Sequence, residues 1–390
     1  MKKLTFILIL FMACTVFGQK PVTPKKIGAP KAAKENALME TSSKKAGPAD
    51  FLALVRVVKD WGYIDGSGAY VIAPQFENAK SFSGGYARVR SAGDWGFIDK
   101  KGSFVINPQF ERAEDFSNGL ARVLKFKTWG YIDETGIFAI NPQFNDAEDF
   151  NDGFARVKKG LLWGLIDKKG NFTVNPQFAE LAKFSEGLAR ARLGKEWGYI
   201  DKTGKWEINP QFDDAEDFDG GLARVRKGMQ WGYIDKSGTY TINPQFEAAG
   251  EFCEGLASAK KMRQWGYIDK KGTWVVNPQF DQAGNFTEGF AKVKKGREWG
   301  YIETSGTYVI NPQFDDAEDF NDDFARVRKG GQWGFINKKG LYVINPQFDK
   351  ANDFVNDFSL VRKGTKWGFI NKSGILEINC MFNDAEDFSK

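Results

Sequence analysis

The chain has 390 residues, of which 42% are apolar and 27% are charged, and its formal net charge is +5. An apolar fraction of this size excludes a largely disordered protein. The sequence contains no histidine, which excludes Ser-His-Asp and Cys-His catalytic groups, and its three cysteines are too few for a four-thiolate metal site. Carboxylate pairs that act on sugars, a lysine nucleophile and metal sites built only from oxygen ligands remain open.

Residues 1–18 have the pattern of a secretory signal peptide. Two lysines precede an apolar run, Leu4–Met12, and cleavage is expected after Gly18. This run is too short to cross a bilayer and no longer one follows, so we expect no transmembrane helix in the mature chain. The stretch that ends at Cys14 also resembles a lipobox, and its use would make the protein an outer-membrane lipoprotein with a lipid anchor on Cys14. Both alternatives predict an exported protein, either periplasmic, on the cell surface or extracellular.

Residues 19–50 are rich in Lys, Pro and Ala and lack helical or strand periodicity, which predicts a disordered linker. Nine of the 55 cationic residues and three of the 50 acidic residues lie within residues 1–50. Residues 51–390 therefore carry 46 cationic and 47 acidic residues, a net charge of −1. Without a bulk positive field, the folded part is not expected to bind nucleic acid.

From residue 61 onward, Trp-Gly recurs ten times at a constant spacing of 34 residues. When each Trp is counted as position 1, position 4 is always Ile, position 8 is always Gly, and positions 16 and 22 are always Phe. The Trp residues that mark the repeats are Trp61, Trp95, Trp129, Trp163, Trp197, Trp231, Trp265, Trp299, Trp333 and Trp367. A constant period of this kind predicts that residues 51–390 form one array of ten units.

Each unit shows the sequence features of three short strands. The segment W-G-Y-I-D predicts a strand, and D-x-x-G predicts a tight turn in which Gly takes a positive φ. The next strand is expected to end at the Pro of position 14, because proline cannot donate to a ladder. After a loop of about a dozen residues, L-A-R-V-R predicts a third strand. The F-x-x-A-x-x-F spacing inside that loop predicts a short helical turn.

The run W-G-[YF]-I-[DN]-x-x-G, followed by N-P-Q-F and A-x-x-F, resembles the WG-repeat family of bacterial proteins. The resemblance covers about residues 51–390 and recurs in phase in all ten copies. It implies a repeat array and carries no catalytic signature. The last copy departs from the pattern, with Cys380 and Met381 in place of Pro-Gln, and is expected to act as a cap.

A unit of three strands cannot bury a face alone, so the units must stack, either in an open array or in a closed ring. Propeller blades usually have four strands and about 40 or more residues, in rings of about 4–8 blades. The 34-residue units do not match, and the last copy stops at Phe388 with no strand left to close a ring. The sequence thus predicts an all-β tandem array of ten three-stranded units, with an open solenoid or superhelix favoured over a closed β-propeller. Cys253 and Cys380, four units apart, are then expected to be unpaired thiols.

A row of basic residues at position 28 is the candidate ligand-binding surface, since stacking would align these side chains on one strand face. The row consists of Arg88, Arg122, Arg156, Arg190, Arg224, Lys292 and Arg326. One interpretation is a groove for a polyanion or an acidic glycan. The other is that these charges pair with the Glu-Asp residues that precede position 22 in half of the units. Those acids lack calcium-loop spacing, so we expect no metal and no cofactor.

The repeat Trp residues also allow two interpretations. An exposed ladder of aromatic rings could stack on sugars, but a large aromatic residue fixed next to Gly favours close packing between units.

The function predicted from these features is a non-enzymatic scaffold that binds an unidentified protein or a cell-envelope polysaccharide through multivalency. Catalysis is not expected, because every carboxylate has counterparts 34 residues away and no copy stands out. The alternatives are a purely structural component of the envelope and, less favoured, a carbohydrate-active enzyme. A repetitive ligand should dock on the uniform rows, whereas a protein partner could use the variable turns that precede each Trp.

Overall fold

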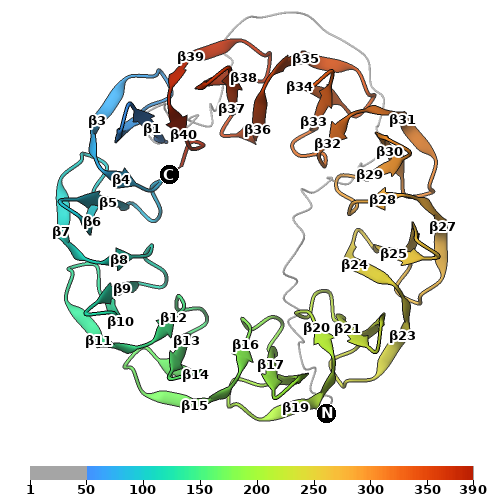
Figure 1. Ribbon diagram of the computed structural model, residues 1–390, viewed down its shortest axis with the longest axis horizontal. Coiled ribbons are helices and arrows are strands. Elements are labelled where there is room, and N and C mark those ends of the chain that lie inside the picture. The colour runs from blue at the N-terminus through green and yellow to red at the C-terminus, as the bar shows by residue number, and fades with distance from the viewer. Residues whose placement is uncertain (1–50, 390) are drawn as a thin grey trace, which may run out of the picture. The chain divides into compact units, whose positions relative to one another are not determined.

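The computed structural model of the protein describes residues 51–389. The predicted signal peptide, the linker and Cys14 lie outside this range. The described residues form forty strands and no helix, and the strands assemble into ten four-stranded antiparallel sheets. Figure 1 shows these sheets arranged radially in a closed ring, with one strand of each sheet at the outer edge. The all-β class and the ten repeats are confirmed. The open array is wrong, because the ten sheets are the blades of a closed β-propeller.

The innermost strand of each blade is the one that the sequence analysis missed. It lies inside the F-x-x-A-x-x-F segment, where a helical turn was expected, and in most blades it is only two residues long. The innermost strands are β4 (Asn78–Ala79), β8 (Arg112–Ala113), β12 (Asp146–Ala147), β16 (Glu180–Leu181), β20 (Asp214–Ala215), β24 (Ala248–Cys253), β28 (Gln282–Ala283), β32 (Asp316–Ala317), β36 (Lys350–Val355) and β40 (Asp384–Ala385). The recurring spacing of three residues therefore corresponds to a short strand and the residues on either side of it, and not to a helix.

The second strand corresponds to the predicted L-A-R-V-R segment. Its alternate residues are fully buried, as in Ala223 and Val225, while the residues between them face the next blade. The second strands are β1 (Ala53–Val57), β5 (Ala87–Ser91), β9 (Ala121–Lys125), β13 (Phe154–Lys159), β17 (Ala189–Leu193), β21 (Ala223–Lys227), β25 (Leu256–Lys261), β29 (Phe290–Lys295), β33 (Phe324–Lys329) and β37 (Phe358–Lys363).

The third strand carries Trp-Gly and ends at the predicted D-x-x-G turn. In the turn after β18, the Asp201 carboxylate accepts hydrogen bonds from the Thr203 and Lys205 amides at 2.8 and 3.0 Å, and Gly204 has a φ of 84°. The third strands are β2 (Asp60–Ile64), β6 (Asp94–Ile98), β10 (Thr128–Ile132), β14 (Leu162–Asp167), β18 (Glu196–Ile200), β22 (Gln230–Ile234), β26 (Gln264–Ile268), β30 (Glu298–Glu303), β34 (Gln332–Asn337) and β38 (Lys366–Asn371).

The outermost strand runs through the N-P-Q-F segment, so the predicted end at Pro of position 14 is wrong. Pro74, for example, lies within β3, where the free edge of the sheet needs no donor from the proline nitrogen. The outermost strands are β3 (Tyr70–Phe76), β7 (Phe104–Phe110), β11 (Phe138–Phe144), β15 (Phe172–Phe178), β19 (Trp206–Phe212), β23 (Tyr240–Phe246), β27 (Trp274–Phe280), β31 (Tyr308–Phe314), β35 (Tyr342–Phe348) and β39 (Leu376–Phe382).

The ring closes because the two ends of the array share one sheet. Blade 1 consists of β40, β1, β2 and β3, and blades 2–10 follow in chain order as β4–β7 to β36–β39. In blade 1, Val55 pairs with Ala385 and Arg56 pairs with Asp384. The Glu386 amide donates to the Leu54 carbonyl at 2.9 Å, one of several backbone bonds that join the two ends. The sequence analysis expected no strand near the C-terminus that could close a ring, but the two-residue strand β40 does so.

The apolar core lies between adjacent blades rather than within one layer. Each of its ten clusters combines residues of two neighbouring blades. Between blades 5 and 6, Tyr199 and Ile208 of one blade meet Ala223 and Ile234 of the next. The glycine of the D-x-x-G turn fits against the preceding blade, since a Cβ on Gly238 would lie 3.1 Å from the Ile208 side chain. Stacking therefore buries the apolar side chains that a single blade would leave exposed.

Candidate functional site

The predicted basic row lies on the second strands, at the interfaces between blades. Arg190 of β17 shows the arrangement: its guanidinium donates to the Ala215 carbonyl in the next blade. The same guanidinium lies 2.8 Å from the Glu216 carboxylate and 2.9 Å from the Asp217 carboxylate. One arginine thereby joins a backbone carbonyl and two acids of the neighbouring blade. We call these contacts the inter-blade clamps.

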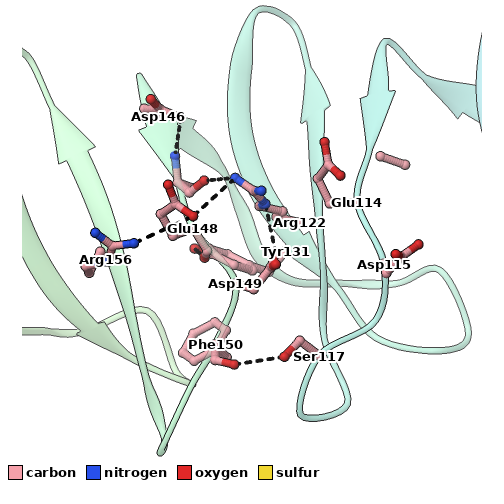
Figure 2. Close-up of polar contacts among 12 residues, drawn as sticks. Glu114, Asp115, Ser117, Arg122, Tyr131, Asp146, Glu148, Asp149, Phe150 and Arg156 are labelled. Atoms are coloured by element: carbon pink, nitrogen blue, oxygen red, sulfur yellow. Dashed lines mark hydrogen bonds and ion pairs between the residues drawn. The ribbon is translucent and has the colours of Figure 1, made fainter. Parts of the chain in front are cut away.

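Most other members of the row form clamps of the same kind. Figure 2 shows Arg122 of blade 3 beside Glu148 and Asp149, which follow β12 in blade 4, and its guanidinium also donates to the carbonyl of Ala147 at the end of β12. The shortest nitrogen-to-oxygen distances are 2.6 Å for Arg88 with Glu114 and with Asp115, 2.8 Å for Arg122 with Asp149, 3.8 Å for Arg224 with Glu251, 2.8 Å for Lys292 with Glu318 and 2.6 Å for Arg326 with Asp353. The interpretation that the basic row pairs with the acids is confirmed. Ligand binding by the row stays a prediction.

The residues facing each other across the interfaces vary together around the ring. Where the row position is not basic, the following blade lacks the acids: Ser258 is followed by Gly284 and Asn285 in the next blade. Two interfaces break this match. Between blades 10 and 1, the buried Leu360 stands where a cation would meet Glu386 and Asp387. Burial raises the pKa of Asp387, against the lowering effect of a hydrogen bond from the Asn352 amide.

The other mismatch lies between blades 4 and 5 and carries an excess of positive charge. Arg156 of β13 faces a blade in which Ala182 and Lys183 replace the Glu-Asp pair. Its guanidinium still donates to the Leu181 carbonyl, but its nearest acid is Glu148 of its own blade, at 3.8 Å. Burial lowers the pKa of Arg156, and this effect is opposed by Glu148.

Two hollows open at this mismatched interface, and both are lined by Arg156 and Lys183. The first has a volume of about 320 Å³ and is walled by the aromatic rings of Phe150, Phe154 and Phe184. The second has a volume of about 400 Å³ and is bounded mainly by residues of blade 5, together with Asp217 of blade 6. The sequence analysis included Arg156 in the row but missed Lys183. The loss of the Glu-Asp pair at Ala182–Lys183 was the signal that could have found it.

A family comparison agrees with the repeat pattern. The family model described as WG containing repeat matches ten times, at residues 61–93, 95–125, 129–160, 163–197, 197–228, 231–261, 265–298, 299–333, 333–367 and 367–390. The chain belongs to the WG-repeat family. No curated protein sequence matches it.

Solved structures similar to this WG-repeat protein are distant in sequence. A crystal structure of a eukaryotic initiation factor aligns with 11% identity and a TM-score of 0.47, over 75% of this chain and 94% of that chain. Hsv2p from Kluyveromyces lactis aligns with 10% identity and a TM-score of 0.34, over 57% and 91%. The dihydro-heme d1 dehydrogenase NirN aligns with 11% identity and a TM-score of 0.32, over 69% and 75%. The assignment of the fold rests on the strand pairing described above.

The Trp-Gly pair of the WG repeat has a structural explanation. Trp197 is half-buried against the apolar cluster between blades 5 and 6, with the guanidinium carbons of Arg190 and Arg192 at 5.5 and 5.7 Å from its ring. The glycine allows the outermost strand to approach, since a Cβ on Gly198 would lie 2.4 Å from the Ile208 carbonyl oxygen. In the WG repeat, the tryptophan ring therefore packs against the clamp arginine, and the absence of a side chain on the glycine lets the outermost strand lie close to it. The packing interpretation of the Trp residues is therefore favoured over an exposed ladder.

The tyrosine that follows Trp-Gly in most units is buried, and its hydroxyl holds the loop of the next blade that carries the clamp acids. The Tyr199 hydroxyl donates to the Glu216 carbonyl at 2.7 Å, and the equivalent bond recurs in other blades, as from Tyr131 to Glu148. Burial raises the pKa of Tyr199 far above its ordinary value. The hydroxyl therefore acts as a neutral donor that holds the loop carrying the clamp acids.

Among residues 51–389, no group of three or more acidic or cysteine side chains is placed to hold a metal ion. Within the same residues, no helix has the length and apolar character needed to cross a bilayer. Cys253 in blade 7 and Cys380 in blade 10 form no disulfide.

Proposed function

We propose that this WG-repeat protein is an exported, non-enzymatic scaffold that holds a protein partner against one face of its ring. Export rests on the signal peptide predicted for residues 1–18. The basic row, which was the first candidate surface, is occupied by contacts between blades. The variable turns that precede each Trp are better suited to docking, and they carry the proposal.

The observation behind this proposal is a series of exposed apolar residues at these turns on five consecutive blades. We call them the tip residues: Phe126, Leu161, Leu193, Met229 and Met262, in blades 3–7. Phe126 is 79% exposed and Met229 is 90% exposed. Equivalent turns lie on the same face, because every blade has the same strand order and direction. Apolar side chains exposed together on one face are typical of a protein interface.

The tip turns are also held in a fixed conformation. The Gly228 amide donates to the Asp213 carboxylate at 2.6 Å, and the Gly160 amide donates to the Asn145 side chain at 2.7 Å. A turn that is already ordered loses less conformational entropy when a partner binds. The scaffold thus presents apolar groups on rigid supports.

Two tip turns adopt a conformation that is unfavourable for their residues. Phe126 and Lys127 have φ values of 55° and 63°, and Met262 and Arg263 have φ values of 52° and 65°. This left-handed region suits Gly or Asn, and a bulky residue there costs about 1–3 kcal/mol. Strain of this kind is typical of positions retained for binding rather than for stability.

The partner that fits this surface combines acidic and apolar groups. Basic residues flank the tip residues, including Lys125, Lys127, Lys195 and Arg263. The acids at the same end accept turn amides, as Glu247 does from Arg263 at 3.2 Å. Five similar tips on one rigid ring allow multivalent docking, in which weak contacts reinforce one another.

The test compares retention of envelope extract by the immobilised full chain and by two variants. The first replaces Phe126, Leu161, Met229 and Met262 by serine. The second replaces three exposed apolar residues of the opposite turns, Ile137, Leu341 and Ile375. We expect a protein that is retained by the wild type and by the second variant but lost from the first. Retention that survives protease treatment of the extract would identify a polysaccharide ligand instead. Equal retention by both variants, or none by the wild type, would contradict the proposal.

A further inference from the structure

We propose that the interface between blades 4 and 5 is a binding site for a small molecule that carries a carboxylate or phosphate group. This site is independent of the tip residues and lies in the first hollow described above, about 320 Å³ in volume. The proposal rests on Arg156, whose clamp acids are missing, on Lys183, which stands in their place, and on the hollow that both residues line. Restoration of the ordinary clamp serves as a test.

The first step concerns charge. In the blade that follows each of the other row arginines, the positions of Ala182 and Lys183 hold at least one acid, and after three of them they hold a Glu-Asp pair, as at Glu216 and Asp217. Their replacement removes two negative charges and adds one positive charge next to Arg156. Within residues 51–389, Lys183 has neither a hydrogen bond nor an ion pair. Two cations, Arg156 and Lys183, thus line the same hollow, together with the acid Asp149.

The second step concerns the acids nearby, because they could cancel this charge. Asp149 lies 2.8 Å from the Arg122 guanidinium, and Asp217 lies 2.9 Å from Arg190. Glu148 lies between Arg122 and Arg156, at 4.0 and 3.8 Å, and so forms no close contact with either. Figure 2 shows this carboxylate between the two arginines. Asp149 and Asp217 therefore contact Arg122 and Arg190 closely, whereas the nearest carboxylate of Arg156 is 3.8 Å away and Lys183 pairs with none of these acids.

The third step concerns shape and chemistry. A volume of about 320 Å³ is near the lower end of the range for small-molecule sites, about 300–1,000 Å³. Arg156 and Lys183 line this hollow together with Phe154, Phe184, Asn151 and Asp149. A guanidinium and an ammonium group bind carboxylate or phosphate oxygens with charge-assisted hydrogen bonds. The phenyl rings can cover an apolar or sugar-ring face of the same molecule.

The remaining clamps explain why the site is confined to one interface. Each of the other row arginines pairs with an acid of the following blade, at 2.6–2.9 Å for Arg88, Arg122, Arg190 and Arg326 and at 3.8 Å for Arg224. A ligand oxyanion at those positions would have to displace a carboxylate that is already bound. At Arg156 it would displace no acid of the following blade, because Ala182 and Lys183 stand at those positions.

The experiment is calorimetric titration of the full chain at low ionic strength, with inorganic phosphate and with glucuronate as probes. We expect saturable binding of at least one probe, and the probe that binds identifies the oxyanion. In Lys183→Asp the affinity should fall about tenfold or more, because the charge next to the ligand is reversed. The control is Lys101→Asp, which makes the same change in charge at an exposed turn in blade 2 and should bind as the wild type does.

A double variant separates binding from folding. Ala182→Glu with Lys183→Asp restores the clamp acids opposite Arg156. It should abolish binding while the melting temperature stays equal to that of the wild type or rises. Saturable binding that is unchanged in the double variant, an equal loss in Lys101→Asp, or no binding of either probe by the wild type would overturn the proposal. None of these results depends on the tip residues.

Discussion

At the scale of single residues, the WG repeat is set by contacts that tolerate little change. A Cβ on Gly198 would lie 2.4 Å from the Ile208 carbonyl oxygen and 2.7 Å from the Pro210 nitrogen, and both atoms belong to the backbone. The outermost strand would have to move away from its neighbour. The glycine of the Trp-Gly pair is therefore explained by the close approach of the outermost strand, whereas the glycine of the D-x-x-G turn is explained by its positive φ.

We expect Gly198→Ala to lower the free energy of unfolding by about 1–3 kcal/mol, the range for overpacked sites. Chemical denaturation measures the change. The control is Gly153→Asp, where φ is 85° and nothing lies within 4 Å of the added Cβ. Aspartate occupies the equivalent position at Asp323, with a φ of 67°, so this variant should change stability by less than Gly198→Ala does. Equal losses from both variants would contradict the role of close approach.

Phe126 gives a prediction of the opposite sign. Its φ of 55° is unfavourable for a bulky residue by about 1–2 kcal/mol. Glycine removes this strain, but its larger loss of conformational entropy on folding costs about 0.5–1 kcal/mol. Phe126→Gly should therefore raise the free energy of unfolding by up to about 1 kcal/mol. Leu161→Gly is the comparison, because Leu161 has no positive φ and gains no relief. Destabilisation of both variants to the same extent would show that the turn of blade 3 is not strained.

At the scale of strands and turns, the sequence predicted three of the four strands of each blade and the D-x-x-G turn. It missed the innermost strand because two residues, such as Asp146 and Ala147, are too few to produce an alternating pattern. The flanking phenylalanines then gave a spacing that also fits a helix. The inter-blade pairing of Arg122 with Asp149 could be anticipated from the charges, but the register that joins them depends on the stacking of blades. The mismatch at Lys183 becomes informative only when that register is known.

The D-x-x-G turns predict how stability responds to acid. Hydrogen bonds lower the pKa of six turn aspartates, as the one from the Thr135 hydroxyl does for Asp133. These residues are Asp65, Asp133, Asp167, Asp201, Asp235 and Asp269. Because the folded-state pKa lies below the unfolded value of about 3.9, their stabilising effect is present above that value and is lost as the pH falls through the folded-state pKa.

The chain contains a natural control for this effect. Asn337 occupies the same turn position, and its side-chain oxygen accepts the Lys339 and Leu341 amides at 3.0 and 3.1 Å without titrating. A variant with all six aspartates replaced by asparagine should keep the turns. Its melting temperature should fall less than that of the wild type between about pH 5 and 3. An identical fall in both proteins would exclude these carboxylates as the source of acid sensitivity.

At the scale of the whole molecule, closure of the ring was the feature that the sequence did not predict. The expected minimum of about 40 residues per blade assumed four full strands. Here an inner strand that has only two residues in most blades completes each blade within the 34-residue period. The pairing of Arg56 with Asp384 joins positions 328 residues apart, and no local pattern encodes such a contact. The departures from the family pattern in the last copy were interpreted as a cap, although that copy also provides the closing strand.

The measurement that tests closure most directly is disulfide formation between β1 and β40. In a variant without the natural cysteines, Arg56→Cys and Asp384→Cys place two thiols on paired residues. The control couples Arg56→Cys with Asp214→Cys, the same repeat position in blade 6. A closed ring predicts that mild oxidation gives an intramolecular disulfide in the first variant and none in the control, as judged by non-reducing electrophoresis and mass spectrometry. Free thiols or only intermolecular disulfides in the first variant would show that the array is open.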